Sequence, residues 1–298
     1  MSATLAPKAV DAPNLFLDVS GRTIAYRKIG EGRPFVLGTR FRGNLDKWDP
    51  AFLDALVEHG LQVITFDYSG LGLSTGQATY NPIEMAQDFR DLIAGLGLRD
   101  AAIGGWSLGG LVVQATLALY PANISQVVII GSGPPGPMVK PSEQTFYDVA
   151  GKENYGGDDN AILFFEPNSA ASRKASEQSL ARLAKRTQEL SREVPIAFAR
   201  ATLEGGPKNP IFPADAILEA LKSTTVPILH VGGDHDIIFP VENWYALNQK
   251  LKTLHVLTFP QAGHGPQHQH PEMCADMISS FIKNTASSSD NTGRTAQQ

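Results

Sequence analysis

Two kinds of segment alternate along the chain. Short runs rich in β-branched and aromatic residues, such as 63–68 and 101–106, are followed by longer segments in which apolar residues recur at helical spacing. Runs of the first kind favour strands, and the longer segments favour helices that cover a sheet. Their alternation predicts an α/β fold with a mostly parallel sheet and helices on both of its faces.

We expect eight strands in this sheet. They are predicted at 15–19, 23–28, 35–38, 63–68, 101–106, 127–130, 228–231 and 255–259. The helices of the same core are predicted at 50–58, 82–96, 108–119, 241–251 and 271–283. Ser20-Gly21 separates the first two strands and favours a hairpin, so the sheet should begin antiparallel and then become parallel.

The alternation stops after the sixth expected strand. Residues 134–224 carry helical patterns, the clearest at 169–190, and Gly156–Asp159 is expected to be a loop. An insertion at this point lies above the carboxyl ends of the parallel strands, where such sheets bind ligands, so we expect a helical cap or lid. Residues 14–133 and 225–283 would then form the core.

Both ends of the chain lack apolar periodicity. Residues 1–13 are rich in alanine and proline and are expected to be a flexible arm, whereas 284–298 form a polar tail that we expect to be disordered. Neither end enters the expected core.

Composition narrows the function classes. The net charge of −5 and the isoelectric point near 5.8 offer no basic surface for nucleic acid. Apolar runs stay far below the ~20 residues that cross a bilayer, and the first residues lack a secretory signal, so we expect a cytoplasmic protein without a membrane partner. The single cysteine, Cys274, is expected to be buried in a helix. The sequence is compatible with a homo-oligomer.

The candidate nucleophile is Ser107, in the segment Gly105-Trp106-Ser107-Leu108-Gly109. This segment fits the pattern Gly-x-Ser-x-Gly and stands between an apolar strand and an amphipathic helix. Such a turn is tight and needs small neighbours, and it places the hydroxyl beside unpaired backbone N–H groups at a helix N-terminus. The alternative interpretation is a serine helix cap with glycines that serve packing.

A serine nucleophile needs a base and a group that orients the base. His264 lies between glycines after the last expected strand, and Asp234 and Asp236 lie in the loop after the strand before it. From the residues alone either carboxylate could reach the imidazole, and we choose Asp236. His268 and His270 are spaced as His-x-His but lack a third ligand, so we expect no metal.

These segments together resemble the α/β-hydrolase superfamily. The similarity covers about 14–133 and 225–283, and includes 67–74, which is similar to the family's Asp-x-x-Gly-x-Gly-x-Ser loop. The resemblance implies that Asp236, the last residue of the Gly-x-x-Asp turn, is the acid. It also implies an oxyanion hole formed by the backbone N–H groups of Phe41 and Leu108, with that of Arg40 as the alternative if the loop is shifted by one residue.

One loop departs from the family pattern. Where the family carries His-Gly, this chain carries Thr39-Arg40, and Arg42 follows. The two arginines could bind a carboxylate of the substrate, or they could pair with Asp46 or Asp49 nearby, which we expect. The candidate substrate-binding residues are Arg40, Trp106, Phe164 and Phe165.

The predicted function is hydrolysis of an ester or lactone of a small organic substrate through an acyl-enzyme on Ser107, without a cofactor. Serine at this position disfavours the epoxide hydrolases and haloalkane dehalogenases of the superfamily, which carry aspartate. The segment around Ser107 is instead similar to those of carboxylesterases and some lactonases. Two alternatives stay open. One is carbon–carbon bond hydrolysis of a diketone-type substrate, and the other is a slow-turnover or non-catalytic small-molecule receptor on the same fold.

Overall fold

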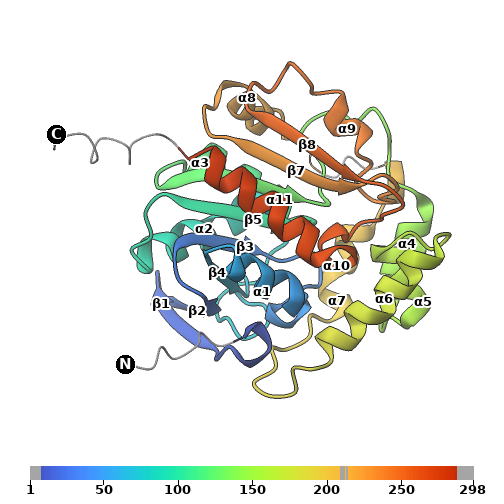
Figure 1. The fold of residues 1–298 in the computed structure, drawn as a ribbon. Helices are drawn as coiled ribbons and strands as arrows, with labels where there is room; N and C mark the ends of the chain where they lie inside the picture. Colours follow the sequence, from blue (N-terminus) through green and yellow to red (C-terminus); the bar gives the residue numbers. More distant parts are fainter. Residues whose placement is uncertain (1–7, 209–211, 213, 287–298) are drawn as a thin grey trace, which may run out of the picture.

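The computed structural model describes residues 8–208, 212 and 214–286 (Figure 1). Its core is one eight-stranded sheet with the strand order β1-β2-β4-β3-β5-β6-β7-β8. The strands are β1 (Leu15–Val19), β2 (Arg22–Ile29), β3 (Arg33–Gly38), β4 (Leu61–Phe66), β5 (Ala101–Trp106), β6 (Ile124–Ile130), β7 (Ile228–Gly233) and β8 (Leu254–Phe259). β1 with β2 and β2 with β4 are antiparallel, and the other pairs are parallel. The predicted mostly parallel sheet is therefore confirmed.

Helices cover both faces of this sheet. On one face α1 (Pro50–Glu58) packs against α11 (Pro271–Asn284), and on the other lie α2 (Pro82–Gly95), α3 (Leu108–Leu119) and α8 (Asp215–Ser223) (Figure 1). β5 and β7 are buried along their whole length, as expected for strands covered on both sides. Because these strands are parallel, their carboxyl ends lie at the same edge of the sheet.

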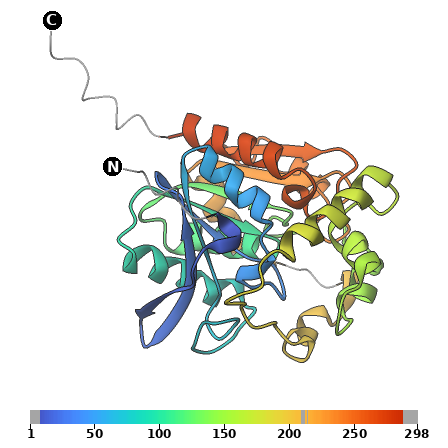
Figure 2. The same ribbon diagram turned by 60° about the horizontal axis from the view of Figure 1, so that its bottom comes forward.

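The chain between β6 and β7 is helical where it is described. It contains α4 (Gln144–Ala150), α5 (Gly157–Phe164), α6 (Ala170–Leu183), α7 (Ile196–Ala199), two short 3-10 helices and α8. α6 packs against α10 (Pro266–Gln269), which follows the carboxyl end of β8. Figures 1 and 2 agree in placing α4, α5 and α6 together at this side of the sheet.

Three predicted segments differ in the structure. Gly156–Asp159 is the start of α5 rather than a loop, because the Asp159 carboxylate accepts a hydrogen bond from the Gly156 N–H (3.0 Å) and acidic residues suit a helix N-terminus. The predicted helix 241–251 shrinks to α9 (Glu242–Tyr245), and Gln249 adopts a left-handed φ of 66° that a helix does not allow. The predicted helix 169–190 ends as α6 at Leu183.

The described part of the expected arm, residues 8–13, packs against the core. Ala12 is buried, and Ala9 donates its N–H to Asp54 (2.7 Å). Arg186 donates hydrogen bonds to the carbonyls of Val10 and Ala12, so this stretch is held by the segment that follows α6. Residues 1–7 of the arm and 287–298 of the tail lie outside the described residues.

Two further expectations concern the helices. Cys274 is a buried free cysteine in α11, as predicted. Of the helices in the described ranges, none is both long and apolar enough to cross a membrane.

Candidate active site

Ser107 occupies a strained turn between β5 and α3. Its backbone has φ 58° and ψ −118°, a region that costs a non-glycine residue about 1–3 kcal/mol. The turn is closed by tight backbone contacts: a Cβ on Gly105 would lie 2.0 Å from the Gly109 carbonyl oxygen, and one on Gly109 would lie 2.1 Å from the Gly38 carbonyl oxygen. The glycines two residues either side of Ser107 are thus required by space.

We expect Gly109→Ala to destabilise the chain by an amount at the upper end of the ~1–3 kcal/mol that overpacking costs. Backbone must move to admit the methyl group, because the obstructing atom is the Gly38 carbonyl oxygen. Urea unfolding measures the change, and Gly157→Ala is the matched control, since a Cβ there meets nothing within 4 Å. Equal unfolding free energies for the two variants would contradict the packing argument.

Asp236 and His264 form a buried pair at the ends of β7 and β8. His264 Nδ1 lies 2.8 Å from Asp236 Oδ2, and both side chains are almost fully buried. Asp236 Oδ1 accepts the backbone N–H groups of Ile238 and Phe239, each at 2.9 Å. Burial acts to raise the pKa of Asp236, but the charge and hydrogen bond of His264 and the two amides outweigh it, so that pKa is lowered. Asp236 is therefore an ionised partner for the imidazole.

Asp234, the other carboxylate of this loop, contacts the backbone of the histidine loop. It is exposed, and its Oδ1 accepts the Ala262 N–H (3.2 Å). Of the two carboxylates, Asp236 is therefore the one that the structure places in hydrogen-bond contact with the imidazole.

Ser107 and His264 come from strand ends at the same edge of the sheet. Trp106, directly before Ser107, donates its indole N–H to the His264 carbonyl oxygen (2.8 Å), and the two rings lie 6.0 Å apart. Within the described residues no hydrogen bond joins the Ser107 hydroxyl to His264. Such bonds are often long in enzymes without substrate. The fold therefore brings the candidate nucleophile beside the Asp–His pair.

The loop after β3 turns without the missing glycine. The Gly43 N–H donates to the Arg40 carbonyl oxygen (2.8 Å), and Arg42 takes a left-handed φ of 54° in that turn. In the part of the chain that is described, the backbone N–H groups of Phe41, Leu108 and Arg40 donate no hydrogen bond to the protein. Both predicted oxyanion donors are free, and so is the alternative at Arg40.

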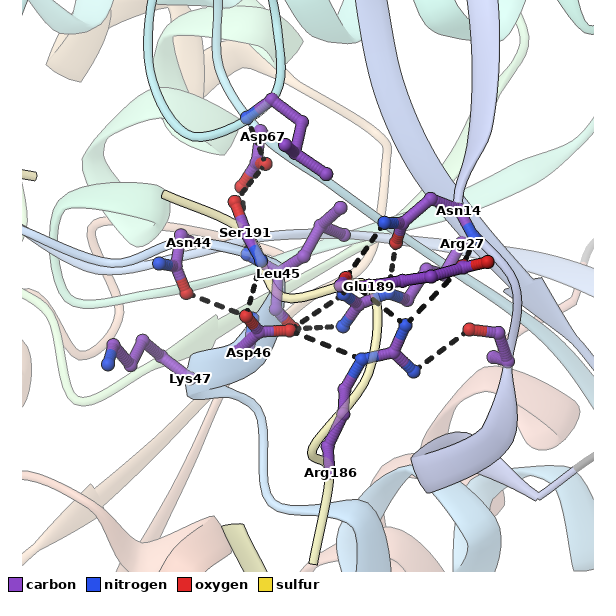
Figure 3. A network of polar contacts seen from close by, with 12 residues as sticks. Asn14, Arg27, Asn44, Leu45, Asp46, Lys47, Asp67, Arg186, Glu189 and Ser191 are labelled. Atoms are coloured by element: carbon purple, nitrogen blue, oxygen red, sulfur yellow. Dashed lines mark hydrogen bonds and ion pairs between the residues drawn. The ribbon is translucent and has the colours of Figure 1, made fainter. Parts of the chain in front are cut away.

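Asp46, an expected partner of the loop arginines, is engaged elsewhere. Its carboxylate contacts Arg27 Nη2 (2.7 Å) and Arg186 Nε (3.5 Å) and accepts the Ser191 N–H (2.6 Å) (Figure 3). This network ties the loop after β3 to β2 and to the segment after α6.

Asp67, the first residue of the family-like loop after β4, joins the same network. Its oxygens accept the Leu45 N–H (2.8 Å) and the Ser191 hydroxyl (2.6 Å) (Figure 3). Burial raises its pKa to about 6, against the hydrogen bonds that lower it. Asp67 therefore holds the loop that carries Arg40 in place.

The expected pairing of Arg40 and Arg42 with Asp46 or Asp49 is wrong. Asp49 is fully buried and binds Arg182 (2.7 Å), a residue of α6. Arg42 instead donates to the backbone carbonyl oxygens of residues 152 and 153, each at 2.8 Å. The partners of both carboxylates lie far along the chain, so sequence proximity suggested the wrong ones.

Arg40 lies over aromatic rings. Its Cζ is 5.4 Å from the centre of the Trp106 ring and 4.7 Å from that of Phe164, and its Nη1 donates to the Phe41 carbonyl oxygen (2.7 Å). Burial lowers the pKa of this guanidinium. Arginine nevertheless keeps its charge in proteins. Cation–π contact with the two rings stabilises the charge in part.

The four candidate substrate-binding residues line one cavity. Arg40, Trp106, Phe164 and Phe165 meet there, and the Phe164 ring stacks 6.2 Å from the ring of His264. The Phe164 carbonyl oxygen accepts the N–H of residue 265 (2.7 Å), which fixes the end of α5 against the histidine loop. The helical segment and the candidate base are thus in direct contact.

Sequence reasoning missed the role of His268 in this cavity. His268 is buried, its Nδ1 lies 2.9 Å from the Ser179 hydroxyl, and its ring is 4.6 Å from that of Trp106. Burial lowers its pKa to about 4. His270 stacks instead on Phe259 (5.2 Å), so the two histidines of the His-x-His motif have different neighbours. No sequence signal marked His268, because its partner is a serine in α6.

His235, beside Asp236, connects the acid loop to the helical segment. Its Nδ1 contacts Glu166 and its Nε2 contacts Glu143 (3.1 Å). Burial lowers the pKa of His235, but the hydrogen bonds and charges of the two glutamates outweigh it, so that pKa is raised above 6.5. The charged form is favoured in the folded chain.

This pair of contacts predicts a pH dependence of stability. A raised histidine pKa contributes stability that is fully present below its unfolded value of about 6.5 and is lost as pH rises through the folded value. We expect the unfolding free energy of His235→Gln to decrease less with rising pH than that of the wild type. Urea unfolding from about pH 6 to about pH 9 measures this. His255→Gln, at an exposed histidine of β8, is the control. An unchanged pH slope in His235→Gln would refute the prediction.

A comparison of the sequence with models of known families matches residues 37–271 to the α/β-hydrolase fold family. The chain belongs to this family. Among relatives of this α/β hydrolase is the pimeloyl-[acyl-carrier protein] methyl ester esterase of Pseudoalteromonas atlantica, 26% identical over 274 residues, with 88% of this chain and 98% of the relative covered. A non-heme haloperoxidase of Rhodococcus erythropolis is 27% identical over 269 residues, with 82% and 90% covered.

A solved structure is similar to the same extent. An α/β-hydrolase fold protein from Chitinophaga pinensis superposes with a TM-score of 0.78 at 28% identity, covering 93% of this chain and 99% of that one. These relatives support a hydrolase, with ester hydrolysis as the activity at the level of the family.

Proposed function

We propose that this α/β hydrolase cleaves an ester or lactone of a small organic substrate through an acyl-enzyme on Ser107. The observation that carries the proposal is a serine in a strained turn beside the buried Asp236–His264 pair. The resemblance to an enzyme named as a methyl ester esterase supports a carboxylic ester as the bond that is broken.

The reaction follows from the roles of these side chains. His264 Nε2 takes the proton of Ser107 as its oxygen bonds to the acyl carbon, and returns that proton to the alcohol oxygen as the ester C–O bond breaks. Water then attacks the acyl carbon, gives its proton to His264, and the acid leaves as the proton returns to Ser107. Asp236 keeps the imidazole proton on Nδ1 and stabilises the imidazolium.

The negative charge of each tetrahedral intermediate would rest on the backbone N–H groups of Phe41 and Leu108. Loss of one such donor typically costs about 100-fold to 1,000-fold in rate. The network of Asp46 and Asp67 therefore supports catalysis indirectly, since it fixes the loop that presents Phe41.

We also propose that α4, α5 and α6 form the cap of the site. The contact of Phe164 with His264 and the packing of α6 on α10 support this role. Substrate would then reach Ser107 between this cap and the edge of the sheet.

One observation favours a second candidate function. The unpaired guanidinium of Arg40 near the site would suit a carboxylate-bearing diketone cleaved at a carbon–carbon bond. Both reactions use the same three side chains, so substrate tests must separate them.

A fluorophosphonate probe tests the proposal directly. We expect one probe molecule per chain, found by mass spectrometry on the peptide that contains Ser107. A panel of short-chain esters, lactones and a vinylogous diketone then assigns the reaction. Hydrolysis of the diketone but not of simple esters would select the carbon–carbon hydrolase, and folded protein that neither labels nor hydrolyses any of them would refute the enzyme and favour a receptor.

A further inference from the structure

In the described chain no carboxylate forms an ion pair or a hydrogen bond with Arg40, although the charge of Glu193 acts on it. Of its nitrogen atoms, Nη1 donates to the Phe41 carbonyl oxygen, whereas Nε is buried and has no hydrogen-bond partner. A buried donor without a partner destabilises the fold, and more so when it is charged. A ligand that supplies the missing hydrogen-bond acceptors would pair this buried cation beside the candidate active site.

Glu193, whose charge acts on Arg40, and Asp49 are both committed to other cations. Asp49 binds Arg182 (2.7 Å), and Glu193 binds Lys47 (2.5 Å). Neither carboxylate is therefore available to Arg40 without breaking an existing ion pair.

The cavity beside Arg40 is lined by positively charged side chains. Arg40 and Lys47 both line it, and among its described lining residues there is no aspartate or glutamate. Arg40 Cζ lies 4.7 Å from the centre of the Phe164 ring, and that centre lies 6.2 Å from the centre of the His264 ring. These two distances together set an upper limit to the separation between the guanidinium and the imidazole, so the two groups lie in the same region of the molecule.

His268 adds a second unpartnered atom to the same cavity. The Ser179 hydroxyl donates its proton to Asp49 (2.8 Å), so His268 Nδ1 must be the donor in its contact with Ser179. His268 Nε2 is then a bare acceptor, and it is buried without a partner. The cavity thus offers donors from Arg40 and one acceptor, a combination that suits a carboxylate accompanied by a water molecule or a hydroxyl group.

We propose that Arg40 binds a free carboxylate of the substrate, which makes monoesters of short dicarboxylic acids the substrate class. Nε and Nη2 of the guanidinium are parallel donors that match the two oxygens of a carboxylate, and Nη1 is already held by the backbone. The inference rests on the proposed ester hydrolysis at Ser107. A neutral apolar acyl chain would leave Arg40 unpaired in the complex.

The test compares two methyl esters of equal acyl length. Monomethyl adipate carries a free carboxylate and methyl hexanoate does not, and a pH-stat measures kcat/KM for both. We expect wild type to prefer monomethyl adipate, or the best monomethyl ester of the series from succinate to suberate, by roughly 10-fold to 100-fold. Arg40→Met should reduce this ratio to about one. Arg40→Lys keeps the charge but loses the two parallel N–H donors of the guanidinium, so it should give an intermediate ratio.

Arg42→Met is the matched control, because Arg42 lies in the same loop but donates to backbone carbonyl oxygens. We expect it to keep the wild-type ratio. A wild-type ratio near one across the series, with methyl hexanoate hydrolysed and Ser107 labelled, would overturn the carboxylate site and leave the proposed function intact. If Arg40→Met fails to fold by circular dichroism, Arg40→Lys decides: an intermediate ratio supports the site and a wild-type ratio overturns it.

A binding measurement separates the two proposals if no ester is hydrolysed. Calorimetric titration of the folded wild type and of Arg40→Lys with adipate needs no turnover. Tighter binding to wild type supports the carboxylate site even though the hydrolase proposal has failed. Equal binding, or none, overturns it.

Discussion

Replacing Ser107 by alanine is expected to lower kcat for ester hydrolysis by about five to six orders of magnitude, the loss seen when a triad nucleophile is removed. No other hydroxyl in the described residues occupies the turn beside the Asp236–His264 pair, so nothing replaces the acyl-enzyme route. The measurement is hydrolysis of the best ester of the panel, together with loss of fluorophosphonate labelling.

Ser132→Ala is the control for this variant. Ser132 is a buried serine after β6 and contacts the position of Gly110 in α3, but it lies outside the turn. We expect it to keep most of the activity. If Ser107→Ala retained activity and Ser132→Ala lost it, the nucleophile would have been misassigned.

The strain at Ser107 adds a second readout. Glycine adopts a positive φ freely, whereas alanine does not, so Ser107→Gly should unfold with a free energy about 1 kcal/mol higher than that of Ser107→Ala. Urea unfolding of the two variants measures the difference between their unfolding free energies. Both variants lack the Ser107 hydroxyl and are expected to be inactive, so the difference between their unfolding free energies reports the backbone strain alone.

The placement of the three candidate residues could be predicted because their order along the chain follows from the sheet. Ser107, Asp236 and His264 each follow a strand, and parallel strands deliver their carboxyl ends to one edge. The glycines around Ser107 could also be predicted, because the Gly-x-Ser-x-Gly pattern marks a tight turn between a strand and a helix.

The partners of the charged side chains could not be predicted. Asp46 binds Arg27 and Arg186, which come from β2 and from the segment after α6, and these approach only in the folded chain. Nearness in sequence instead suggested Arg40 and Arg42. α6 ends at Leu183, although the helical pattern continues to 190, and Glu189 within that pattern adopts a left-handed φ of 50°.

Asp236→Asn is expected to lower kcat by about four orders of magnitude. Asparagine keeps an acceptor for the N–H groups of Ile238 and Phe239, so the loop stays in place. Its amide, however, presents an N–H to His264 Nδ1. This favours the tautomer with the proton on Nε2, which cannot accept the proton of Ser107.

Asp234→Asn is the matched control, with the same chemical change two residues away. Asp234 is exposed and its carboxylate accepts the Ala262 N–H, so we expect kcat to stay near the wild-type value. The pair of variants separates electrostatic support of the imidazole from general effects of charge on the loop. A large loss in Asp234→Asn with a small one in Asp236→Asn would move the catalytic acid to Asp234, and would require the loop to rearrange when substrate binds.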